Sequence, residues 1–405
     1  SDSGGLLEWS LGLRESNLLG LGKEVLVEAG REERDDFWGC GYSDPRLFGA
    51  RLSLVLRAAF GARLDLQELN LRRAFESAAY PWGFTIDARR FSGPVVDHRG
   101  GIDGPEWSAE TRYLSGTIGL RVRGNEYGAL RLSPLVYLLS ERYEEPPDSL
   151  RTLGGSGSAA EPFRDREIRA VGVGVEMLRE RFRQLSRIDG LGRWEDIDLG
   201  GNVEAGIGPS LRRWGARRDA LFITLRAQQG VDLGPGRLLL ASLQGLGQVR
   251  SGRTDDAWLE VRARYYDQVF ERHTLAAGLR GTFGGDLAPQ DLPTLGAHTG
   301  LRGFKAHRFW GDHAVVANLE DRLLVVEDLF GLVSIGLAGF VDAGTTWQAG
   351  QHQRARPRIC AGLGLRLQSR RAGGPLVTRV DVAHPLEGGD GDDGWVLSFA
   401  TGQAF

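Results

Sequence analysis

The chain has 405 residues and a formal net charge of −3, so no global positive field attracts nucleic acid, and nucleic acid is not expected as a partner. Its 17 Phe, 10 Trp and 8 Tyr exclude a disordered chain, and no apolar run approaches the roughly 20 residues of a membrane-spanning helix. The mean hydropathy of −0.25 does not exclude a membrane β-barrel, because apolar and polar positions alternate along its strands and average away.

Alternation with a period of two residues predicts strands along the whole chain. In the segment 112–123, Leu114, Ile118 and Leu120 fall on one face, whereas Arg121 falls on the other. Successive side chains of a strand point to opposite faces, so each such segment has an apolar and a polar wall. The predicted strands cover residues 6–15, 22–31, 35–43, 49–60, 84–91, 111–123, 126–139, 168–180, 195–207, 219–229, 236–247, 257–268, 273–283, 313–325, 332–343, 358–369, 375–384 and 394–404.

The connections between these strands alternate between short turns and long polar stretches such as 141–167 and 284–312. Short turns at one end and long loops at the other are typical of an outer-membrane barrel. A soluble β-sandwich or propeller is the alternative. However, Arg and Glu recur on the polar faces of many strands, and no repeat of propeller length is visible. We therefore predict an all-β fold, with residues 1–405 forming a single transmembrane antiparallel β-barrel of about 16 strands.

Five ordered motifs occur in the last third of the chain. The first is LRGF, which comprises Leu301, Arg302, Gly303 and Phe304. The others are AVVANLEDRLL at 314–324 with Glu320 and Arg322, GFVDAGTTW at 339–347 with Phe340, Asp342 and Gly344, GLGLRLQSRRAGGPLVTRVDVAHP at 362–385, and the final TGQAF at 401–405.

In order and spacing these motifs resemble the Omp85 superfamily, which includes the outer-membrane protein assembly barrels and the two-partner secretion transporters. The resemblance is specific over 285–405 and looser, but collinear, over 1–60. The segment between them carries only the barrel pattern.

The resemblance implies that 284–312 is loop six of the barrel, that it folds back into the lumen, and that Arg302 pairs with Asp342. Alternation independently places Asp342, Glu320 and Arg322 on the polar, lumen-facing side of their strands. An arginine fork can hold a carboxylate with two hydrogen bonds, and losing one partner of a dehydrated pair costs about 3–5 kcal/mol. The alternative is that Arg302 is one of many solvated loop arginines.

The C-terminal strand places Phe399 and Phe405 on one apolar face, so Phe405 is expected in the aromatic girdle at the membrane interface. The resemblance also implies that this terminus is a signal read by the barrel-assembly machinery. Gly402 is expected to weaken a seam between the first and last strands, because glycine packs and pairs poorly in strands.

The resemblance implies a protein of the Gram-negative outer membrane, with its signal peptide removed, that inserts polypeptides into this membrane or moves them across it without catalysis. The expected partners are outer-membrane lipids, lipopolysaccharide and a polypeptide client. Family members usually carry substrate-receiving POTRA domains, and none is recognised in this chain. A periplasmic or lipoprotein partner is therefore expected to supply that role. The alternatives are a passive diffusion pore and a membrane anchor or exporter for a separately encoded effector such as a lipase.

No cofactor or metal is indicated by the sequence. Cys40 and Cys360 are too few for a disulfide framework, and the 7 His lack zinc-binding spacing.

Overall fold

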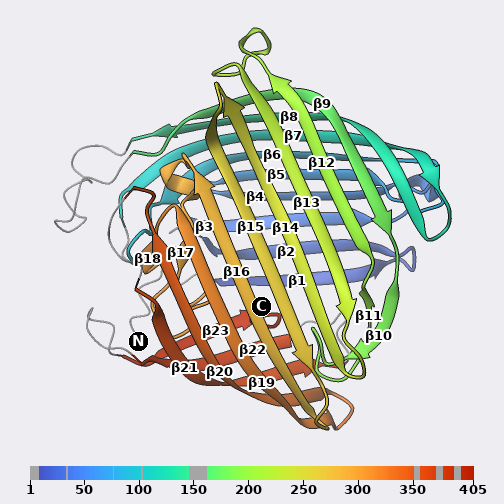
Figure 1. Cartoon of the computed structure of the whole chain (residues 1–405), viewed down its shortest axis with the longest axis vertical. Coiled ribbons are helices and arrows are strands. Elements are labelled where there is room, and N and C mark those ends of the chain that lie inside the picture. Colours follow the sequence, from blue (N-terminus) through green and yellow to red (C-terminus); the bar gives the residue numbers. More distant parts are fainter. Residues whose placement is uncertain are drawn as a thin grey trace.

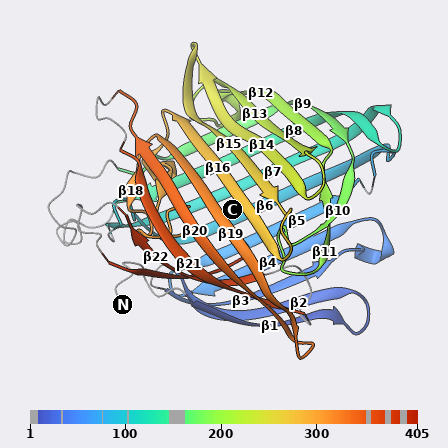
Figure 2. The same ribbon diagram turned by 60° about the horizontal axis from the view of Figure 1, so that its bottom comes forward.

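The computed structural model describes residues 9–32, 35–75, 77–101, 104–145, 162–350, 356–370, 377–386 and 394–405. Within these residues, 19 strands form one continuous sheet that curls around a central lumen (Figures 1 and 2). The strands of this sheet are β1 (Trp9–Leu18), β2 (Lys23–Glu32), β3 (Asp35–Asp44), β4 (Ser53–Gly61), β5 (Asp65–Arg73), β6 (Trp82–Val96), β7 (Glu106–Gly124), β8 (Gly128–Glu144), β9 (Arg166–Arg179), β12 (Gly201–Ser210), β13 (Ala220–Asp232), β14 (Arg237–Arg250), β15 (Arg253–Asp267), β16 (His273–Gly285), β19 (His313–Leu329), β20 (Val333–Trp347), β21 (Arg358–Ser369), β22 (Val377–Pro385) and β23 (Val396–Thr401).

Each strand pairs with the next strand of this sheet, and all these pairings are antiparallel. The predicted antiparallel barrel fold is confirmed, but 19 strands replace the expected number of about 16. The prediction omitted β5 and merged two elements within 195–207, where β11 (Trp194–Asp198) ends before β12 begins.

The two faces of the sheet have opposite chemistry, as the alternation predicted. In β19, the inward side chains of Asn318, Glu320 and Arg322 are buried, whereas Leu319 is 49% exposed on the outer face. In β7, the outward Leu114, Ile118, Leu120 and Val122 are likewise exposed. An apolar outer wall around a charged lumen is the arrangement expected of a barrel in lipid.

Within the described ranges, helical structure is limited to three short 3-10 turns, η1 (Leu47–Gly49), η2 (Arg212–Trp214) and η3 (Pro289–Asp291). None of the described helical segments has the length and apolar character needed to cross a bilayer.

Two insertions enter the barrel from opposite ends. Loop six, residues 286–312, joins β16 to β19 and contains η3 and a small ladder between β17 (Thr294–Leu295) and β18 (Phe309–Trp310). At the other end, β10 (Phe182–Ser186) pairs with β11 to form the hairpin 182–198, which lies between β9 and β12 (Figure 1). This hairpin was not predicted from the sequence.

The sheet has two edge strands, β1 and β23. Both run from the loop-six end of the barrel to the hairpin end, as the alternating strand directions require. Over the residues that the structure describes, no register joins β1 to β23.

The C-terminal tail corrects one expectation. Phe399 lies on the outer face of β23 and is 63% exposed, as expected. Gly402 follows the end of β23 with a φ of +88°, so the chain turns away from the strand there. Phe405 therefore packs inside the barrel against the cluster around Ile188 and Tyr266, and it does not belong to the outer aromatic girdle.

Candidate functional site

Loop six is closed on itself before it meets the barrel wall. The β17–β18 ladder joins its two arms, and the Leu301 amide donates to the Gly296 carbonyl at 2.9 Å. The tip formed by Leu301, Arg302, Gly303 and Phe304 is buried throughout. Its fold thus presents the whole LRGF motif to the inner surface of β19, β20 and β21.

Arg302 and Asp342 form a bidentate ion pair within the lumen. The Arg302 Nη2 donates to Asp342 Oδ1 at 2.7 Å, and its Nε donates to Oδ2 at 2.9 Å. The Arg302 backbone amide adds a third bond to the same carboxylate at 3.2 Å. Because Arg302 is only 2% exposed and Asp342 is fully buried, the pair is shielded from solvent.

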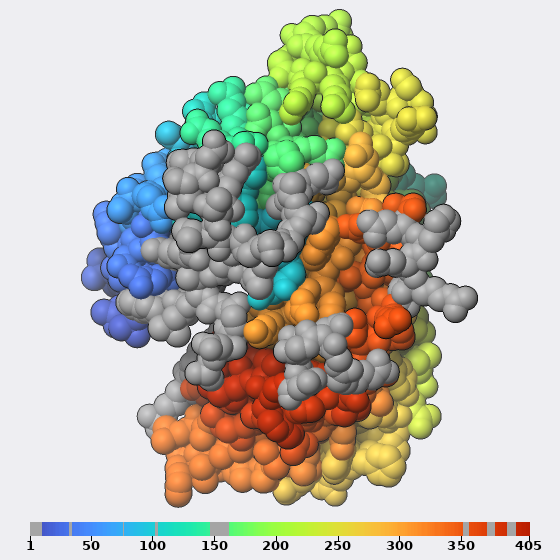
Figure 3. Space-filling model, turned by 90° about the vertical axis from the view of Figure 1, so that its left-hand side faces the viewer, coloured from blue at the N-terminus to red at the C-terminus, as the bar shows by residue number. Residues whose placement is uncertain are grey.

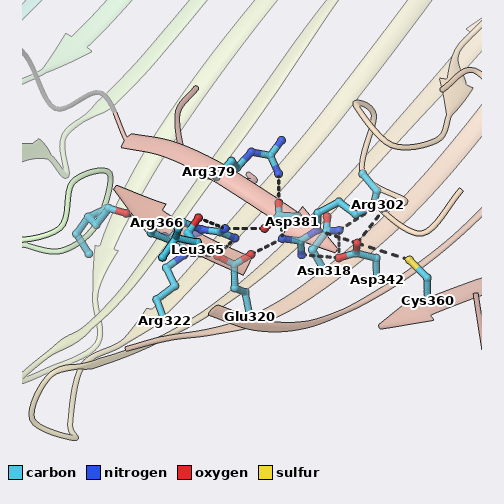
Figure 4. A network of polar contacts seen from close by, with 12 residues as sticks. Arg302, Asn318, Glu320, Arg322, Asp342, Cys360, Leu365, Arg366, Arg379 and Asp381 are labelled. Carbon is cyan, nitrogen blue, oxygen red and sulfur yellow. Dashed lines mark hydrogen bonds and ion pairs between the residues drawn. The ribbon is translucent and has the colours of Figure 1, made fainter. Parts of the chain in front are cut away.

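A wider charge network extends this pair along the wall (Figure 4). Glu320 accepts hydrogen bonds from Arg302 at 2.5 Å, Arg322 at 3.0 Å and Arg366 at 3.1 Å. Asp381 accepts from Arg366 at 2.6 Å and from Arg379 at 2.9 Å. A single loop arginine is therefore bound to carboxylates that arise from two neighbouring strands, β19 and β20, and to a network that reaches β22.

Two further contacts orient the Arg302 guanidinium. Asn318 bridges loop and wall, because its amide nitrogen donates to the Gly300 carbonyl at 2.8 Å and to Asp342 at 2.7 Å. The Phe340 ring lies under the guanidinium, with its centroid 3.4 Å from the Arg302 Cζ. A stacked aromatic face adds a cation–π attraction to the ion pair, which a lysine could not match in geometry.

Close backbone approach explains two of the predicted glycines. A Cβ on Gly303 would lie 2.5 Å from the Cys360 Cβ, and a Cβ on Gly344 would lie 3.0 Å from Leu295. The Gly303 amide donates to the Cys360 sulfur at 3.1 Å. Both glycines therefore allow loop six to lie directly against β20 and β21.

Phe304 fixes the apolar side of the loop tip. It belongs to a buried cluster with Leu295, Leu301, Val316 and Cys360. Its ring also meets Phe309 edge to face at a centroid distance of 5.2 Å.

The mouth of the barrel beside loop six is polar. A turn between β6 and β7 touches the loop, because the Gly100 amide donates to the His307 carbonyl at 3.0 Å. Figure 3 looks onto this end, where the orange atoms of loop six lie beside the cyan of that turn. Beneath the loop is a cavity of about 590 Å³, whose charged lining comes from Glu141, Arg166, Asp256, Glu260, Arg280 and Asp291.

Sequence reasoning named most of this site but missed part of the network. Arg366, Arg379, Asp381 and Cys360 all contact the residues around Arg302 or Asp342, and none was proposed as a site residue. Arg366 and Asp381 lie inside motifs that the sequence already displays, at positions of inward parity. A search for buried opposite charges on neighbouring strands would have found them. The GPL part of the fourth motif, at 374–376, lies outside the described residues.

Comparison with known proteins gives a match to one family model and several similar solved structures. Residues 250–405 match the sequence profile of the Omp85 superfamily domain. No curated protein matches the sequence.

Similar solved structures include BamA from Haemophilus ducreyi lacking POTRA domains 1-3, with a TM-score of 0.51 and 13% identity over 97% of this chain and 69% of that one. CdiB from Escherichia coli has a TM-score of 0.43 and 13% identity, over 98% of this chain and 63% of that one. CdiB from Acinetobacter baumannii has a TM-score of 0.45 and 13% identity, over 98% of this chain and 59% of that one. This chain therefore spans only part of the length of each, and its likeness to BamA is one of fold.

Proposed function

Because residues 250–405 match the Omp85 superfamily domain, we propose that this chain is a barrel of the Gram-negative outer membrane that inserts polypeptides into this membrane or moves them across it. The observation that supports this function is the buried anchor between Arg302, Asp342 and Glu320, which holds a long loop inside the lumen. The work proposed is transport without catalysis.

Loop six is the proposed lid of the lumen. Three hydrogen bonds to Asp342 and one to Glu320 hold Arg302, and losing one partner of such a buried pair costs about 3–5 kcal/mol. A barrier of this size keeps the loop in place unless a client or partner supplies competing contacts. The lid therefore prevents free diffusion while leaving a route that regulated opening can use.

A lateral seam between β1 and β23 is the second part of the proposal. In the part of the chain that the structure describes, β1 pairs with β2 alone, and Leu11 and Leu13 on it are 76% and 84% exposed. Edge strands with open hydrogen-bonding groups are templates for another strand, so the seam offers an exit toward lipid. Phe399 belongs to this seam, whereas Gly402 and Phe405 act from the tail that turns into the lumen.

The proposed partners follow from this role. The apolar outer face contacts outer-membrane lipids, and the loop ends contact lipopolysaccharide. A polypeptide client passes through the lumen or the seam.

The test combines conductance with identification of the client. In planar bilayers the wild-type protein should conduct little, and Arg302→Ala should raise conductance because the lid is released. Asp321→Ala is the matched control, since its carboxylate lies on the outer side of β19, away from the Arg302 network, and contacts the partly exposed His273 at 3.0 Å. Mass spectrometry of proteins that co-purify from native membranes should identify a client, and cysteine pairs that join β1 to β23 should abolish its transport.

The alternative functions give different results. A large, steady conductance that is equal in wild type and Arg302→Ala would identify a passive pore. Co-purification of an effector such as a lipase, with full activity in the seam-locked barrel, would identify an anchor or exporter. Cys40 must first be replaced, because it is an exposed thiol, whereas Cys360 is buried and can stay.

A further inference from the structure

The hairpin 182–198 meets the barrel wall at a small cavity on the side of the charge network remote from loop six. The Ile188 carbonyl accepts a hydrogen bond from Arg322 Nη1 at 3.0 Å. Three residues later, the Leu191 amide donates to Gln368 Oε1 at 2.7 Å. These two bonds bring the hairpin tip against β19 and β21.

The cavity beside this contact is bordered by the hairpin, the wall and the C-terminal tail. Its polar lining comes from Arg187, Arg272, Thr274, Arg322, Arg366 and Gln403. It offers about 10 Å³ to the centre of a water-sized sphere, which is room for one small species. Among the described residues, no aspartate or glutamate lines it.

Four of the lining side chains have a buried nitrogen with no hydrogen-bond partner. These atoms are Arg187 Nε, Arg322 Nη2, Arg366 Nε and Gln403 Nε2. Arg366 is fully buried and Arg322 is 4% exposed, so bulk water cannot serve them. Among the described residues, Gln403 Oε1 is the one buried side-chain acceptor of this lining without a partner. Buried donors without acceptors are costly, and guanidinium groups can only donate.

The charges of the residues around the cavity also favour a negatively charged ligand. Arg302, Arg322, Arg366 and Arg379 share three carboxylates, those of Glu320, Asp342 and Asp381. Arg187 adds a further positive charge, and no carboxylate within the described residues forms an ion pair with it. A water molecule accepts about two hydrogen bonds and must itself donate two, whereas a small anion can accept from all four of these donors and carries a charge opposite to that of the guanidinium groups.

We propose that this cavity binds one small inorganic anion of the size of chloride. The anion accepts hydrogen bonds from the wall arginines, from Arg187 of the hairpin and from Gln403 of the tail, and thereby fastens hairpin and tail to β19 and β21. The proposal does not depend on the transport function proposed above.

Bromide provides a direct structural test. Crystals of the purified barrel grown in sodium bromide should show an anomalous scattering peak in the cavity. In Arg187→Ala combined with Gln403→Ala this peak should be lost. Arg183→Ala is the matched control, because this hairpin arginine pairs with Asp232 outside the cavity and should leave the peak in place. Absence of the peak from the wild type, with water alone in the cavity, would overturn the proposal.

Hairpin protection in solution gives an independent readout. A broad-specificity protease should cleave the hairpin slowly in chloride and faster when gluconate, which is too large for the cavity, replaces it at equal ionic strength. At a chloride concentration of about ten Kd, mass action predicts roughly tenfold protection. Arg187→Ala with Gln403→Ala should remove this difference, and Arg183→Ala should preserve it. Equal cleavage of wild type in both salts would contradict the proposal.

Discussion

Loop six and the hairpin 182–198 occupy the same lumen from opposite ends, but they are fastened by different chemistry. Loop six is held by Arg302, whose guanidinium binds Asp342 and Glu320 within a buried network. The hairpin is held by apolar packing of Ile188 and by hydrogen bonds that involve its backbone, from Arg322 and to Gln368. Ionic anchoring demands one register of the loop, whereas apolar packing tolerates small shifts. The difference indicates that loop six is the more strictly positioned of the two segments.

The contacts that hold loop six and those that hold the hairpin both involve β19. Glu320 and Arg322 are both inward residues of β19 and bind each other at 3.0 Å. Glu320 holds loop six, and Arg322 holds the hairpin. Substitutions that disrupt the contacts of loop six alone, or those of the hairpin alone, can therefore test whether the two segments are held independently.

The largest effect is expected from Asp342→Ala, which leaves the Arg302 fork without its bidentate partner. Loss of one member of a buried pair costs about 3–5 kcal/mol, or more than about 100-fold in the docking equilibrium of the loop. Limited proteolysis should therefore cleave much faster between Leu295 and Asp312. Asp321→Ala, on the outer side of β19, is the control and should leave cleavage unchanged. Cleavage at the wild-type rate in Asp342→Ala would refute the ionic anchor.

A smaller effect is expected from Gly303→Ala, which keeps every charge but removes the close approach of the loop. The new methyl group would lie 2.5 Å from the Cys360 Cβ, so the loop must shift away from β21 toward the centre of the lumen. Overpacking of this kind costs about 1–3 kcal/mol, and cleavage of loop six should rise accordingly. Gly339→Ala is the control, because its Cβ would lie 3.7 Å from Leu363, an ordinary contact. Equal cleavage in both variants would show that the tip does not need close contact with β21.

The smallest effect is expected from Ile188→Val in the hairpin. The substitution removes one buried methylene and keeps the carbonyl that Arg322 binds, so it should cost about 0.5–1.5 kcal/mol. Proteolysis should increase within the hairpin and stay unchanged in loop six. Ile223→Val on the outer face of β13 is the control. Accelerated cleavage of loop six by Ile188→Val would show instead that the two segments open as one unit.

The fold and the loop-six site were largely readable from the sequence, for physical reasons. A lumen in water and an outer wall in lipid impose period-two alternation, which revealed β7, β19 and β20. In β5 this signal fails, because Leu66 and Leu69 are three residues apart and point to opposite faces. The prediction therefore missed that strand.

The hairpin was not predicted because the alternation of apolar residues in β11 continues into β12. Ile197, Leu199, Val203 and Ile207 keep the same parity, so β11 and β12 read as one strand. Only tertiary packing distinguishes the lumen-directed Ile197 from the lipid-directed Val203. The position of Phe405 inside the barrel was also not predicted. The chain turns at Gly402, so Phe405 does not continue the alternation of β23 that the sequence pattern suggests.

The odd number of strands has a geometrical consequence for the seam. The nineteen antiparallel strands that the structure describes leave β1 and β23 pointing in the same direction. One strand laid between them would be antiparallel to both and would complete a barrel of even order. A two-stranded hairpin laid there would meet one edge in the parallel sense, whose pairing is slightly less stable per residue. Because the described sheet has an odd number of strands, the seam is expected to pair better with one added strand than with a two-stranded hairpin, whatever their side chains.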